Sequence, residues 1–336
     1  MGGEGSKVRE DSERAPNRIG IVSTSMIPTP PREGYGGIEL LVGELVKELE
    51  KIGYEVRLYA LDSDLEPRLG VTRGDDELSL AVKAYEDWRN GEIDVVLDWS
   101  HQKFLSRYPV SRAASMCFWT DAVGVNPVYP SKAVAEAFRS LNPLDSGRVI
   151  YPGIDISRYK LSRSREDWFI FFSRIIPEKG VEKAVAVAKA AGVRLKVAGH
   201  TGRFAYDKGY VEHIKKLCTG KIEWVGEVSE EEKIDLLSHA RGLIFSPVWL
   251  ESFGIFLVEA LASGCPCIVS ADCGGPSEQI EHGRTGFKCW GIRDFVWAIE
   301  NIDKIDPDEC RRRAEYFTSK RMAKDWDKYI SGELLW

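Results

Sequence analysis

Short apolar runs alternate with amphipathic segments along the first half of the chain. Runs rich in β-branched and aromatic residues are typical of buried strands, whereas apolar residues at three- to four-residue spacing are typical of helices. This pattern predicts strands at 18–25, 54–61, 94–98, 114–119 and 148–151, and helices at 38–51 and 131–140. Strands and helices that alternate in this way favour an α/β fold with parallel sheets.

The same alternation restarts after Pro152-Gly153. It predicts strands at 168–173, 194–198, 222–225, 243–246 and 266–270, and helices at 181–191, 210–217, 229–240, 256–263 and 294–301. We therefore expect two Rossmann-like domains facing each other across a cleft, because parallel sheets bind ligands at the carboxyl ends of their strands. The expected division is a disordered polar tail at 1–17, domains at 18–152 and 153–315, and a last helix within 316–336 that packs back on the N-terminal domain.

Composition narrows the class of protein. Of the 336 residues, 43% are hydrophobic and 29% charged, and the net charge is −6, which is typical of a soluble globular protein. No apolar run reaches the roughly 18–20 residues of a membrane span, and the polar N-terminus lacks the apolar core of a signal peptide. Seven scattered cysteines then favour a reducing, cytoplasmic location. Residues 1–155 carry 18 Lys and Arg against 25 Asp and Glu, which argues against nucleic acid as a partner.

Two cations follow the first predicted strand of the second half. Arg174 and Lys179 lie in the segment Ser-Arg-Ile-Ile-Pro-Glu-Lys-Gly, between the strand at 168–173 and the helix at 181–191. The carboxyl end of a parallel strand, next to a helix N-terminus, is where α/β folds commonly hold anions. The planar fork of arginine and the point charge of lysine together suit a diphosphate, although the same residues could form a solvated loop.

Two glutamates flank the start of a later helix. Glu251 precedes the helix predicted at 256–263, and Glu259 lies eight positions on, within it. Gly254 between them allows a ligand to approach the helix N-terminus closely, and each carboxylate can accept two hydroxyl groups at once. The alternative is that Glu251 interacts with the helix dipole and Glu259 is an exposed acid. The apolar neighbours of Glu259 argue against that alternative.

The order of several motifs resembles a known family. The segments are Ser-Arg-x3-Glu-Lys-Gly, Trp-Val-Gly-Glu-Val, Glu-x7-Glu around Ser-Phe-Gly, Gly-Gly-Pro-Ser-Glu and Gly-Arg-Thr-Gly-Phe, and they lie within 168–290. In this order they are similar to the retaining family 4 glycosyltransferases, which have the GT-B fold. In the first half, Gly34-Tyr35-Gly36-Gly37 resembles that family's glycine loop, and Pro130-Ser131-Lys132 and Tyr151-Pro152-Gly153-Ile154-Asp155 resemble its later landmarks.

The resemblance implies a metal-independent enzyme that moves a sugar from a nucleotide-diphosphate donor to an acceptor, with no cofactor besides the donor substrate. Arg174 and Lys179 would neutralise the diphosphate. Glu251 would hold the transferred sugar and Glu259 the donor ribose. The remaining donor contacts would be Phe253, Gly254 and Ile255 at sugar and phosphate, Val225 at the base, and Gly36 and Gly37 over the diphosphate. The N-terminal domain would hold the acceptor, which would be a sugar, a glycoconjugate or a lipid-linked sugar.

The group from the first half that would face the anomeric carbon has two candidates. The family often carries a histidine in the fifth strand of its N-terminal domain, where this chain reads Phe118-Trp119-Thr120-Asp121. His101 follows an earlier predicted strand and is the only histidine of the first half. Asp121 and His101 are therefore competing candidates, and they complete the catalytic neighbourhood of Arg174, Lys179 and Glu251.

Two patterns imitate metal sites. Asp62-Ser63-Asp64 imitates the metal-binding motif of another glycosyltransferase fold, but the other features of that fold are missing. Four cysteines gather near His282 without the paired spacing of zinc modules, at Cys265, Cys267, Cys273 and Cys289. We therefore expect no metal.

The last predicted helix is basic. Its residues are typical of a solvated face but would also suit peripheral contact with an anionic membrane that holds a lipid-linked acceptor. They are Arg311, Arg312, Arg313, Lys320, Arg321, Lys324 and Lys328.

Two alternative functions remain open. The missing histidine would also fit a catalytically silent subunit that binds a nucleotide sugar for an active partner. The same fold also supports other reactions, such as those of a phosphorylase or a non-hydrolysing epimerase. The sequence does not indicate the nucleotide base, the sugar, the acceptor or the oligomeric state.

Overall fold

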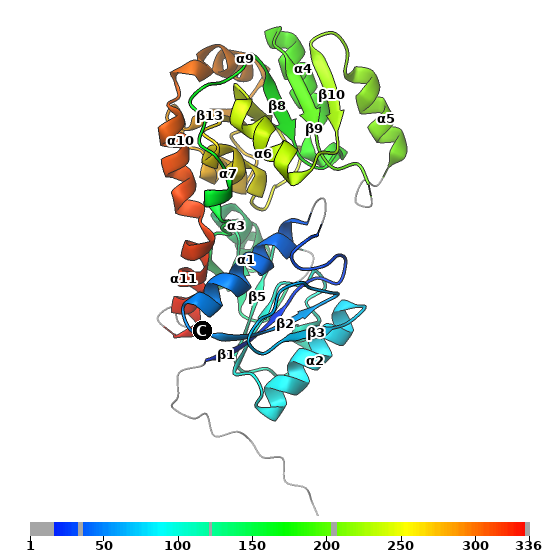
Figure 1. The fold of residues 1–336 in the computed structure, drawn as a ribbon, viewed down its shortest axis with the longest axis vertical. Coiled ribbons are helices and arrows are strands. Elements are labelled where there is room, and N and C mark those ends of the chain that lie inside the picture. Colours follow the sequence, from blue (N-terminus) through cyan, green and yellow to red (C-terminus); the bar gives the residue numbers. More distant parts are fainter. Residues whose placement is uncertain (1–16, 33–35, 121–122, 203–206, 333–336) are drawn as a thin grey trace, which may run out of the picture.

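The computed structural model describes residues 17–32, 36–120, 123–202 and 207–332. Two parallel sheets form two lobes that are stacked along the long axis of the molecule (Figure 1). The expected α/β class, with two Rossmann-like sheets, is confirmed. We refer below to the lobe built on strands β1–β7 as the N lobe and to the lobe built on strands β8–β13 as the C lobe.

The sheet of the N lobe has seven strands in the order β3-β2-β1-β4-β5-β6-β7. All of its pairings are parallel. Its strands are β1 (Arg18–Val22), β2 (Glu55–Ala60), β3 (Val71–Arg73), β4 (Val95–Asp98), β5 (Ala113–Met116), β6 (Pro127–Tyr129) and β7 (Arg148–Val149). The helices between them are α1 (Gly37–Lys51), α2 (Glu77–Asn90) and α3 (Lys132–Leu141).

The sheet of the C lobe has six parallel strands in the order β10-β9-β8-β11-β12-β13. Its strands are β8 (Phe169–Phe172), β9 (Leu195–Ala198), β10 (Ile222–Gly226), β11 (Gly242–Phe245), β12 (Cys267–Ser270) and β13 (Gly286–Cys289). The helices of this part of the chain are α4 (Val181–Ala191), α5 (Lys208–Leu217), α6 (Glu230–His239), α7 (Ile255–Ala262), α8 (Gly275–Gln279), α9 (Ile292–Asn301), α10 (Pro307–Ala314) and α11 (Ser319–Ile330).

The sequence pattern did not predict helix α2, whose Glu77 contacts His101. Its termini do carry local signals, because Asp76 caps the helix by accepting a hydrogen bond from the Ser79 amide at 2.8 Å, and Gly91 ends it at a φ of 82°. Its apolar stripe is narrow, however, since the buried apolar side chains are only Leu80, Ala81 and Ala84. The other missed elements are short, namely β3, β6, β13, α8 and α10.

Strand order determines where ligands can bind. In both sheets the order reverses beside the first strand of the lobe, between β1 and β4 and between β8 and β11. Loops that leave the carboxyl ends of such neighbouring strands diverge and leave a crevice. The residues after these four strands are therefore the ones that the fold places at the cleft between the lobes.

The chain passes between the lobes twice, and the two passages lie side by side. Ile154 on the way out pairs with Thr318 on the way back. Glu278 of α8 also binds across the lobes, since its carboxylate accepts hydrogen bonds from the amides of Lys132 at 3.1 Å and Ala133 at 2.7 Å and from the Tyr151 hydroxyl at 2.7 Å. The conspicuous motifs around residues 131, 151 and 278 thus meet at the junction between the lobes.

Helix α11 returns to the N lobe and lies against α1 (Figure 1). Its Trp326 is fully buried and packs on Trp99, with ring centroids 6.0 Å apart. Tyr54 donates a hydrogen bond to Asp327 at 2.7 Å. The C-terminal segment therefore becomes part of the N lobe.

The Tyr54–Asp327 hydrogen bond gives a first prediction. Tyr54→Phe should lower the free energy of unfolding by about 1 kcal/mol, because it removes one hydrogen bond to a carboxylate that water can still solvate. Chemical denaturation followed by tryptophan fluorescence measures the change. Asp327→Asn keeps an acceptor for the tyrosine hydroxyl and should cost less. Equal losses in the two variants would contradict the assignment.

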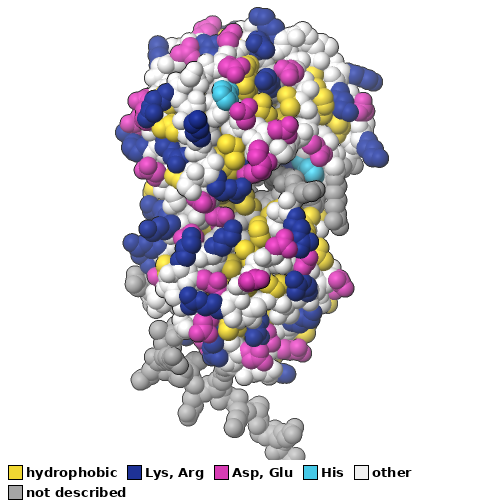
Figure 2. Space-filling view, in the orientation of Figure 1, with side chains coloured by type: hydrophobic (Ala, Val, Ile, Leu, Met, Phe, Trp, Pro, Cys, Tyr) yellow, Lys and Arg dark blue, Asp and Glu magenta, His cyan; other side chains and the backbone are white. Residues whose placement is uncertain are grey.

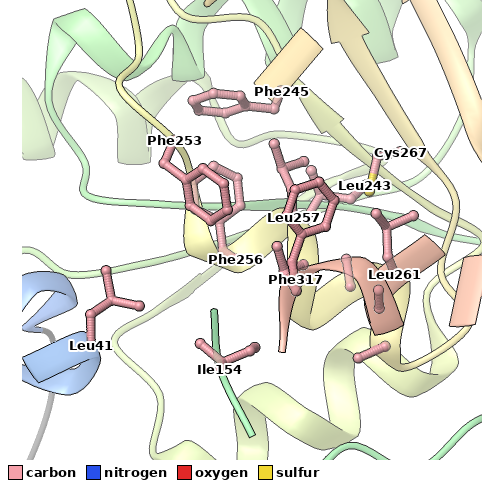
Figure 3. Packing of buried hydrophobic residues seen from close by; sticks show 14 of the residues in the cluster. Leu41, Ile154, Leu243, Phe245, Phe253, Phe256, Leu257, Leu261, Cys267 and Phe317 are labelled. Atoms are coloured by element: carbon pink, nitrogen blue, oxygen red, sulfur yellow. The ribbon is translucent and has the colours of Figure 1, made fainter. Parts of the chain in front are cut away.

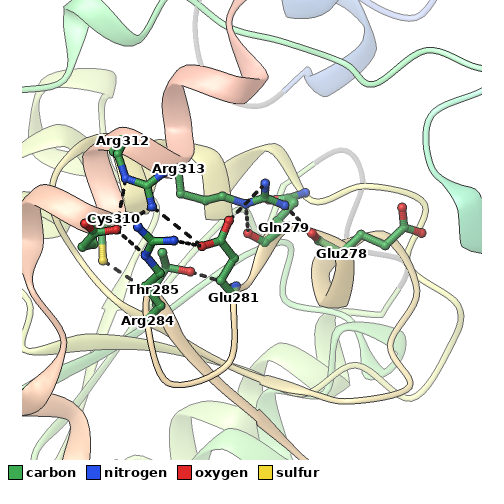
Figure 4. Close-up of polar contacts among 9 residues, drawn as sticks. Glu278, Gln279, Glu281, Arg284, Thr285, Cys310, Arg312 and Arg313 are labelled. Atoms are coloured by element: carbon green, nitrogen blue, oxygen red, sulfur yellow. Dashed lines mark hydrogen bonds and ion pairs between the residues drawn. The ribbon is translucent and has the colours of Figure 1, made fainter.

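Two arginines of α10 bond to backbone carbonyls of the C lobe. Arg313 donates to the carbonyl oxygens of Gln279 at 2.8 Å and Glu278 at 2.6 Å (Figure 4). Arg311 donates to the carbonyl oxygens of Tyr159 and Ala262. Arg312 is exposed and pairs with Glu309 of the same helix. Arg311 and Arg313 therefore fix α10 in place. Within the described part of the chain, no helix is long and apolar enough to cross a membrane.

A buried apolar cluster packs behind the C-lobe wall of the cleft. Phe253 and Phe256 of the loop and helix after β11 pack with Phe245 and Phe317 (Figure 3). The rings of Phe245 and Phe256 meet edge to face with centroids 4.7 Å apart, and those of Phe253 and Phe317 with centroids 5.7 Å apart. Helix α7 is buried at almost every position, so its N-terminus has a rigid base.

Candidate functional site

A cleft of about 2000 Å³ lies between the lobes and is lined by both. The loops after β1, β4, β8 and β11 all contribute to its walls. On the face shown in Figure 2, positive and negative side chains are interspersed, without a broad patch of one sign. The cleft is large enough for a ligand with several chemically distinct parts.

Lys179 and Glu251 form a buried ion pair on the C-lobe wall. Lys179 Nζ donates to the Glu251 carboxylate, and only 4% of the Lys179 side chain and 7% of the Glu251 side chain are exposed. Trp249 Nε1 donates to the same carboxylate at 3.1 Å. Gly180 allows this approach, because its φ is 70° and a Cβ there would lie 1.9 Å from the Ser246 carbonyl oxygen. The loops after β8 and β11 are thus pressed together.

Burial determines the charge behaviour of this pair. Desolvation lowers the pKa of Lys179, and the neighbouring Arg174 lowers it further, while the Glu251 carboxylate opposes both effects. Arg174 also lines the cleft. An anion placed beside Lys179 and Arg174 would offset their mutual repulsion, so this corner of the cleft favours an anionic ligand.

The lowered pKa of Lys179 predicts a pH dependence for nucleoside diphosphate binding. The protonated amine is the form that attracts a diphosphate, so affinity should be highest below the pKa of Lys179. The affinity should fall by up to about tenfold per pH unit above that pKa. This decline should begin at a lower pH than it would for a lysine with an ordinary pKa. Calorimetric titrations between neutral and alkaline pH measure the decline. Lys179→Arg should remove it, because a guanidinium stays protonated throughout; a decline of equal size in that variant would contradict the assignment.

The Gly-Gly-Pro-Ser-Glu motif holds the loop that carries Glu251. The Glu251 amide donates to the Cys273 carbonyl at 3.0 Å, and the Gly275 amide donates to the Glu251 carbonyl at 2.9 Å. A Cβ on Gly274 would lie 2.5 Å from the Glu251 carbonyl oxygen, at a φ of 86°. Only glycine permits this close packing of two backbones. The motif therefore has a positioning role that its sequence alone does not reveal.

Gly254 begins helix α7 at the wall of the cleft. Its φ is 83°, and no side chain caps the helix N-terminus. Gln279 donates to the Phe253 carbonyl at 2.5 Å and fixes the backbone just before the helix. Phe253, Gly254 and Ile255 all line the cleft, as the sequence predicted. The positive end of the helix dipole adds to the attraction for an anion.

Glu259 is buried within α7, with 3% of its side chain exposed. It accepts hydrogen bonds from the Tyr159 hydroxyl and from Lys233 Nζ, each at 2.7 Å. Burial alone would lower the pKa of Lys233, but Glu259 and Glu230 raise it above its usual value. Because Glu259 is buried, it is not the exposed helix acid of the alternative interpretation. It also lines the cleft, together with Lys233 and Glu230.

Sequence reasoning missed Tyr159 and Lys233. Tyr159 precedes the first strand of the C lobe, and Lys233 lies in the acidic helix α6 after its Ser229 cap. Neither has a motif or a spacing that relates it to Glu259, which lies 100 and 26 positions away. The contact between Lys233 and Glu259 arises only when α6 and α7 pack together.

The N-lobe wall presents Gly36, Gly37 and His101. Gly36 caps the N-terminus of α1, and Glu39 in its first turn is buried and accepts a hydrogen bond from Thr24. Desolvation raises the pKa of Glu39. His101 reaches the cleft from the loop after β4. Asp121, the competing candidate, lies outside the described residues.

The expected place of Val225 beside the nucleotide base stays a prediction. Val225 lies in the edge strand β10, where it is half-buried and packs against the core of the C lobe. The wall of the cleft nearest to it is formed by residues 227–231, which leave the sheet after β10 ends at Gly226. The loop after β10 therefore belongs to the wall of the cleft.

The two patterns that imitate metal sites have other partners. The carboxylates of Asp62 and Asp64 both accept hydrogen bonds from Arg32. The cysteines at 265, 267, 273 and 289 are buried with free thiols. Within the described ranges, no cluster of His, Cys, Asp and Glu has the arrangement of a metal site.

Comparisons with known proteins relate the C-terminal half to one family. Residues 154–317 match the model of the family "Glycosyl transferases group 1". The chain is 25% identical over 211 residues to alpha-1,3/1,6-mannosyltransferase ALG2 of Homo sapiens. This match covers 55% of this chain and 50% of that protein. The chain thus spans about half the length of the curated relatives that it matches.

Solved structures match nearly the whole chain in fold. AviGT4, a glycosyltransferase involved in avilamycin A biosynthesis, is 24% identical with a TM-score of 0.75, and the match covers 95% of this chain and 98% of that one. HepE of Anabaena, solved with UDP and glucose, is 16% identical with a TM-score of 0.69, over 94% and 99% of the two chains. Two facing parallel sheets and the matched solved structures therefore agree that the chain has the GT-B fold, and its residues 154–317 match the glycosyl transferases group 1 family.

Proposed function

We propose that this protein is a retaining glycosyltransferase that moves a sugar from a nucleotide-diphosphate donor to an acceptor, without a metal ion. The observation that carries the proposal is the convergence of Arg174, Lys179, Glu251 and Glu259 on one wall of the cleft. The match to the family supports it, because its members are retaining enzymes of this class. The Anabaena relative of the same fold was solved with UDP-glucose, which supports a nucleotide sugar as the donor.

Each part of the donor has a matching group on the C lobe. The diphosphate fits between Lys179, Arg174 and the N-terminus of α7, where two cations and the helix dipole meet. The transferred sugar fits beside the Glu251 carboxylate, and the ribose beside Glu259. The base fits at residues 227–231. The C lobe is therefore the proposed donor domain and the N lobe the proposed acceptor domain.

The proposed reaction is the same-face displacement that the family resemblance implies. The bond between the anomeric carbon and the diphosphate oxygen breaks, and the acceptor oxygen forms a new bond to the same face of the carbon. The acceptor proton passes to the departing diphosphate oxygen, so charge and atoms balance without an added base. Arg174 and Lys179 stabilise the negative charge that grows on the diphosphate as the bond breaks.

A thermal-shift screen against nucleotide diphosphate sugars tests the proposal. A donor that binds the folded state should raise the melting temperature as its concentration rises, and the uncharged sugar alone should not. Mass spectrometry of the matching donor, incubated with simple sugars, glycoconjugates and lipid-linked sugars, then identifies the acceptor and product. Transfer should be unchanged when EDTA is added. Tight donor binding with no transfer to any acceptor would favour a silent subunit, and conversion of the donor without an acceptor would favour an epimerase.

A further inference from the structure

The loop after β4 is held by three buried ionisable side chains. Glu77, Asp98 and Lys103 are between 0% and 7% exposed, and all of them bond within the short stretch from 98 to 103 or to its amides. Burying charged groups is costly unless they are paired and hydrogen-bonded. Such a concentration around a few residues indicates that the position of this loop matters, and the residue that it presents to the cleft is His101.

Glu77 binds His101 at two points. Its Oε1 accepts hydrogen bonds from the His101 amide at 3.0 Å and from Nδ1 of the ring at 3.1 Å. Its Oε2 accepts from the Gln102 amide at 2.7 Å. Burial would raise the pKa of Glu77, but the hydrogen bonds from His101 and Gln102 lower it, so the carboxylate is ionised and can only accept. The proton between Glu77 and His101 therefore belongs to Nδ1.

Other contacts hold the backbone before His101 and one face of its ring. Asp98 accepts from the Ser100 amide at 2.9 Å and from its hydroxyl at 2.6 Å, and Lys103 Nζ donates to the Ser100 carbonyl. The ring of His101 stacks on Trp119, with centroids 5.6 Å apart and planes 17° apart. Trp119 follows β5 and lines the same cleft as His101.

We propose that Glu77 is a positioning residue that holds His101 against Trp119 as the Nδ1–H tautomer, so that Nε2 accepts a hydrogen bond from a substrate hydroxyl in the cleft. His101 thereby supplies the polar group of the N lobe from the loop after β4 instead of β5. This inference rests on the proposed function for the presence of a hydroxylated substrate. A site built to accept from a hydroxyl discriminates strongly against substrates that lack it.

A double-mutant cycle tests whether Glu77 acts through His101. His101→Asn and Glu77→Ala should each lower kcat by about 10- to 100-fold, because a misplaced group loses most of its effect. The double variant should be no slower than His101→Asn alone, since the second change removes nothing further. If the fold reductions in kcat of the two single variants multiply in the double variant, the proposal is overturned. Asp145→Asn is the matched control, because Asp145 holds the Tyr129 hydroxyl at 2.7 Å in the same lobe and its side chain is 7% exposed; its kcat should be unchanged.

Nitrogen NMR of the imidazole rings gives a readout that a merely structural role would not change. The chain has five histidines, and His101→Asn identifies the resonances of His101 by their loss. In its neutral form, His101 of the wild type should show a protonated Nδ1 and an unprotonated Nε2. Glu77→Gln keeps one acceptor oxygen and should retain this tautomer with a smaller loss of kcat, whereas Glu77→Ala should show a mixture of tautomers. A protonated Nε2 with an unprotonated Nδ1 in the wild type would overturn the proposal.

Kinetics with and without an acceptor show which hydroxyl His101 accepts from. If the hydroxyl belongs to the transferred sugar, His101→Asn should slow both hydrolysis of the donor and transfer. If it belongs to the acceptor, only transfer should slow and the acceptor KM should rise. Either result supports the proposal, and unchanged rates of both reactions would overturn it. Binding of UDP, GDP or ADP alone should be unaffected in these variants. If the wild type binds none of these nucleotides, it is the proposed function that fails.

Discussion

Lys179→Ala is expected to lower kcat for sugar transfer by about 10²- to 10³-fold, the effect typical of removing one charged group that stabilises a developing anion. Lys179 is a buried cation on the C-lobe wall, and an alanine in its place would leave no charge there. The KM for the donor should also rise, because the ground-state diphosphate carries negative charge as well. Steady-state kinetics with the donor found by the thermal-shift screen measure both effects.

The Lys179→Ala variant will also lose stability, which has to be separated from catalysis. Removing the cation leaves the Glu251 carboxylate buried without its charge partner, at a cost of about 3–5 kcal/mol. The double variant Lys179→Met with Glu251→Gln removes both charges and keeps the volume of the pair. It should recover most of the melting temperature, since an uncharged pair of similar volume is commonly as stable as the ion pair. Recovery of sugar transfer in that double variant would contradict the assigned role.

Glu259→Ala is expected to have the second largest effect. It removes the partner of Lys233 and Tyr159 from a buried position, which should lower the free energy of unfolding by about 3 kcal/mol. The loss should stay at the lower end of the range for buried pairs, because Lys233 keeps its 2.7 Å contact with Glu230. Glu259→Gln retains an acceptor oxygen for the tyrosine hydroxyl and should be less destabilised. Thermal and chemical denaturation of both variants measure these losses.

The ribose role of Glu259 has its own signature. Hydrogen bonds from sugar hydroxyls to a carboxylate contribute about 1.5–3 kcal/mol, so Glu259→Ala should weaken binding of the ribonucleoside diphosphate by about 10- to 100-fold. Binding of the 2′-deoxy and 3′-deoxy analogues should already be weak in the wild type and should change less in the variant. If the variant weakens all three ligands equally, Glu259 supports the fold of the cleft rather than contacting the ribose.

The sequence determined the class of fold because strands and helices have strong local signals. The apolar runs at 18–25 and 168–173 contain the central strands β1 and β8, which are buried on both faces. The helix predicted at 229–240 is α6, whose Ser229 and Glu232 form a capping box. Where the signal was weak the prediction failed. Helix α2 has a narrow apolar stripe, and the three-residue strands β3 and β6 are too short for a period to show.

The sequence also named four charged groups that line the C-lobe wall of the cleft. Arg174, Lys179, Glu251 and Glu259 lie in ordered motifs at the carboxyl ends of β8 and β11, and this position follows from the alternation of strands and helices. The role of Val225 at the base stays a prediction. The three arginines of α10 bond to carbonyl oxygens and to Glu309, contacts that the sequence did not indicate, and peripheral membrane contact by the basic segment stays a prediction.

Only the tertiary structure decided which of these groups touch. Lys179 meets Glu251 across 72 positions, Tyr159 meets Glu259 across 100, and Glu77 meets His101 across 24. Hydrophobic period and capping residues act over a few positions, so they specify elements but not their neighbours. The neighbours follow from strand order, which places the loops after β1 and β4 opposite those after β8 and β11. The sequence thus determined the fold and named the charged residues of the C-lobe wall, and the packing of distant segments determined the ion pairs and the orientation of His101.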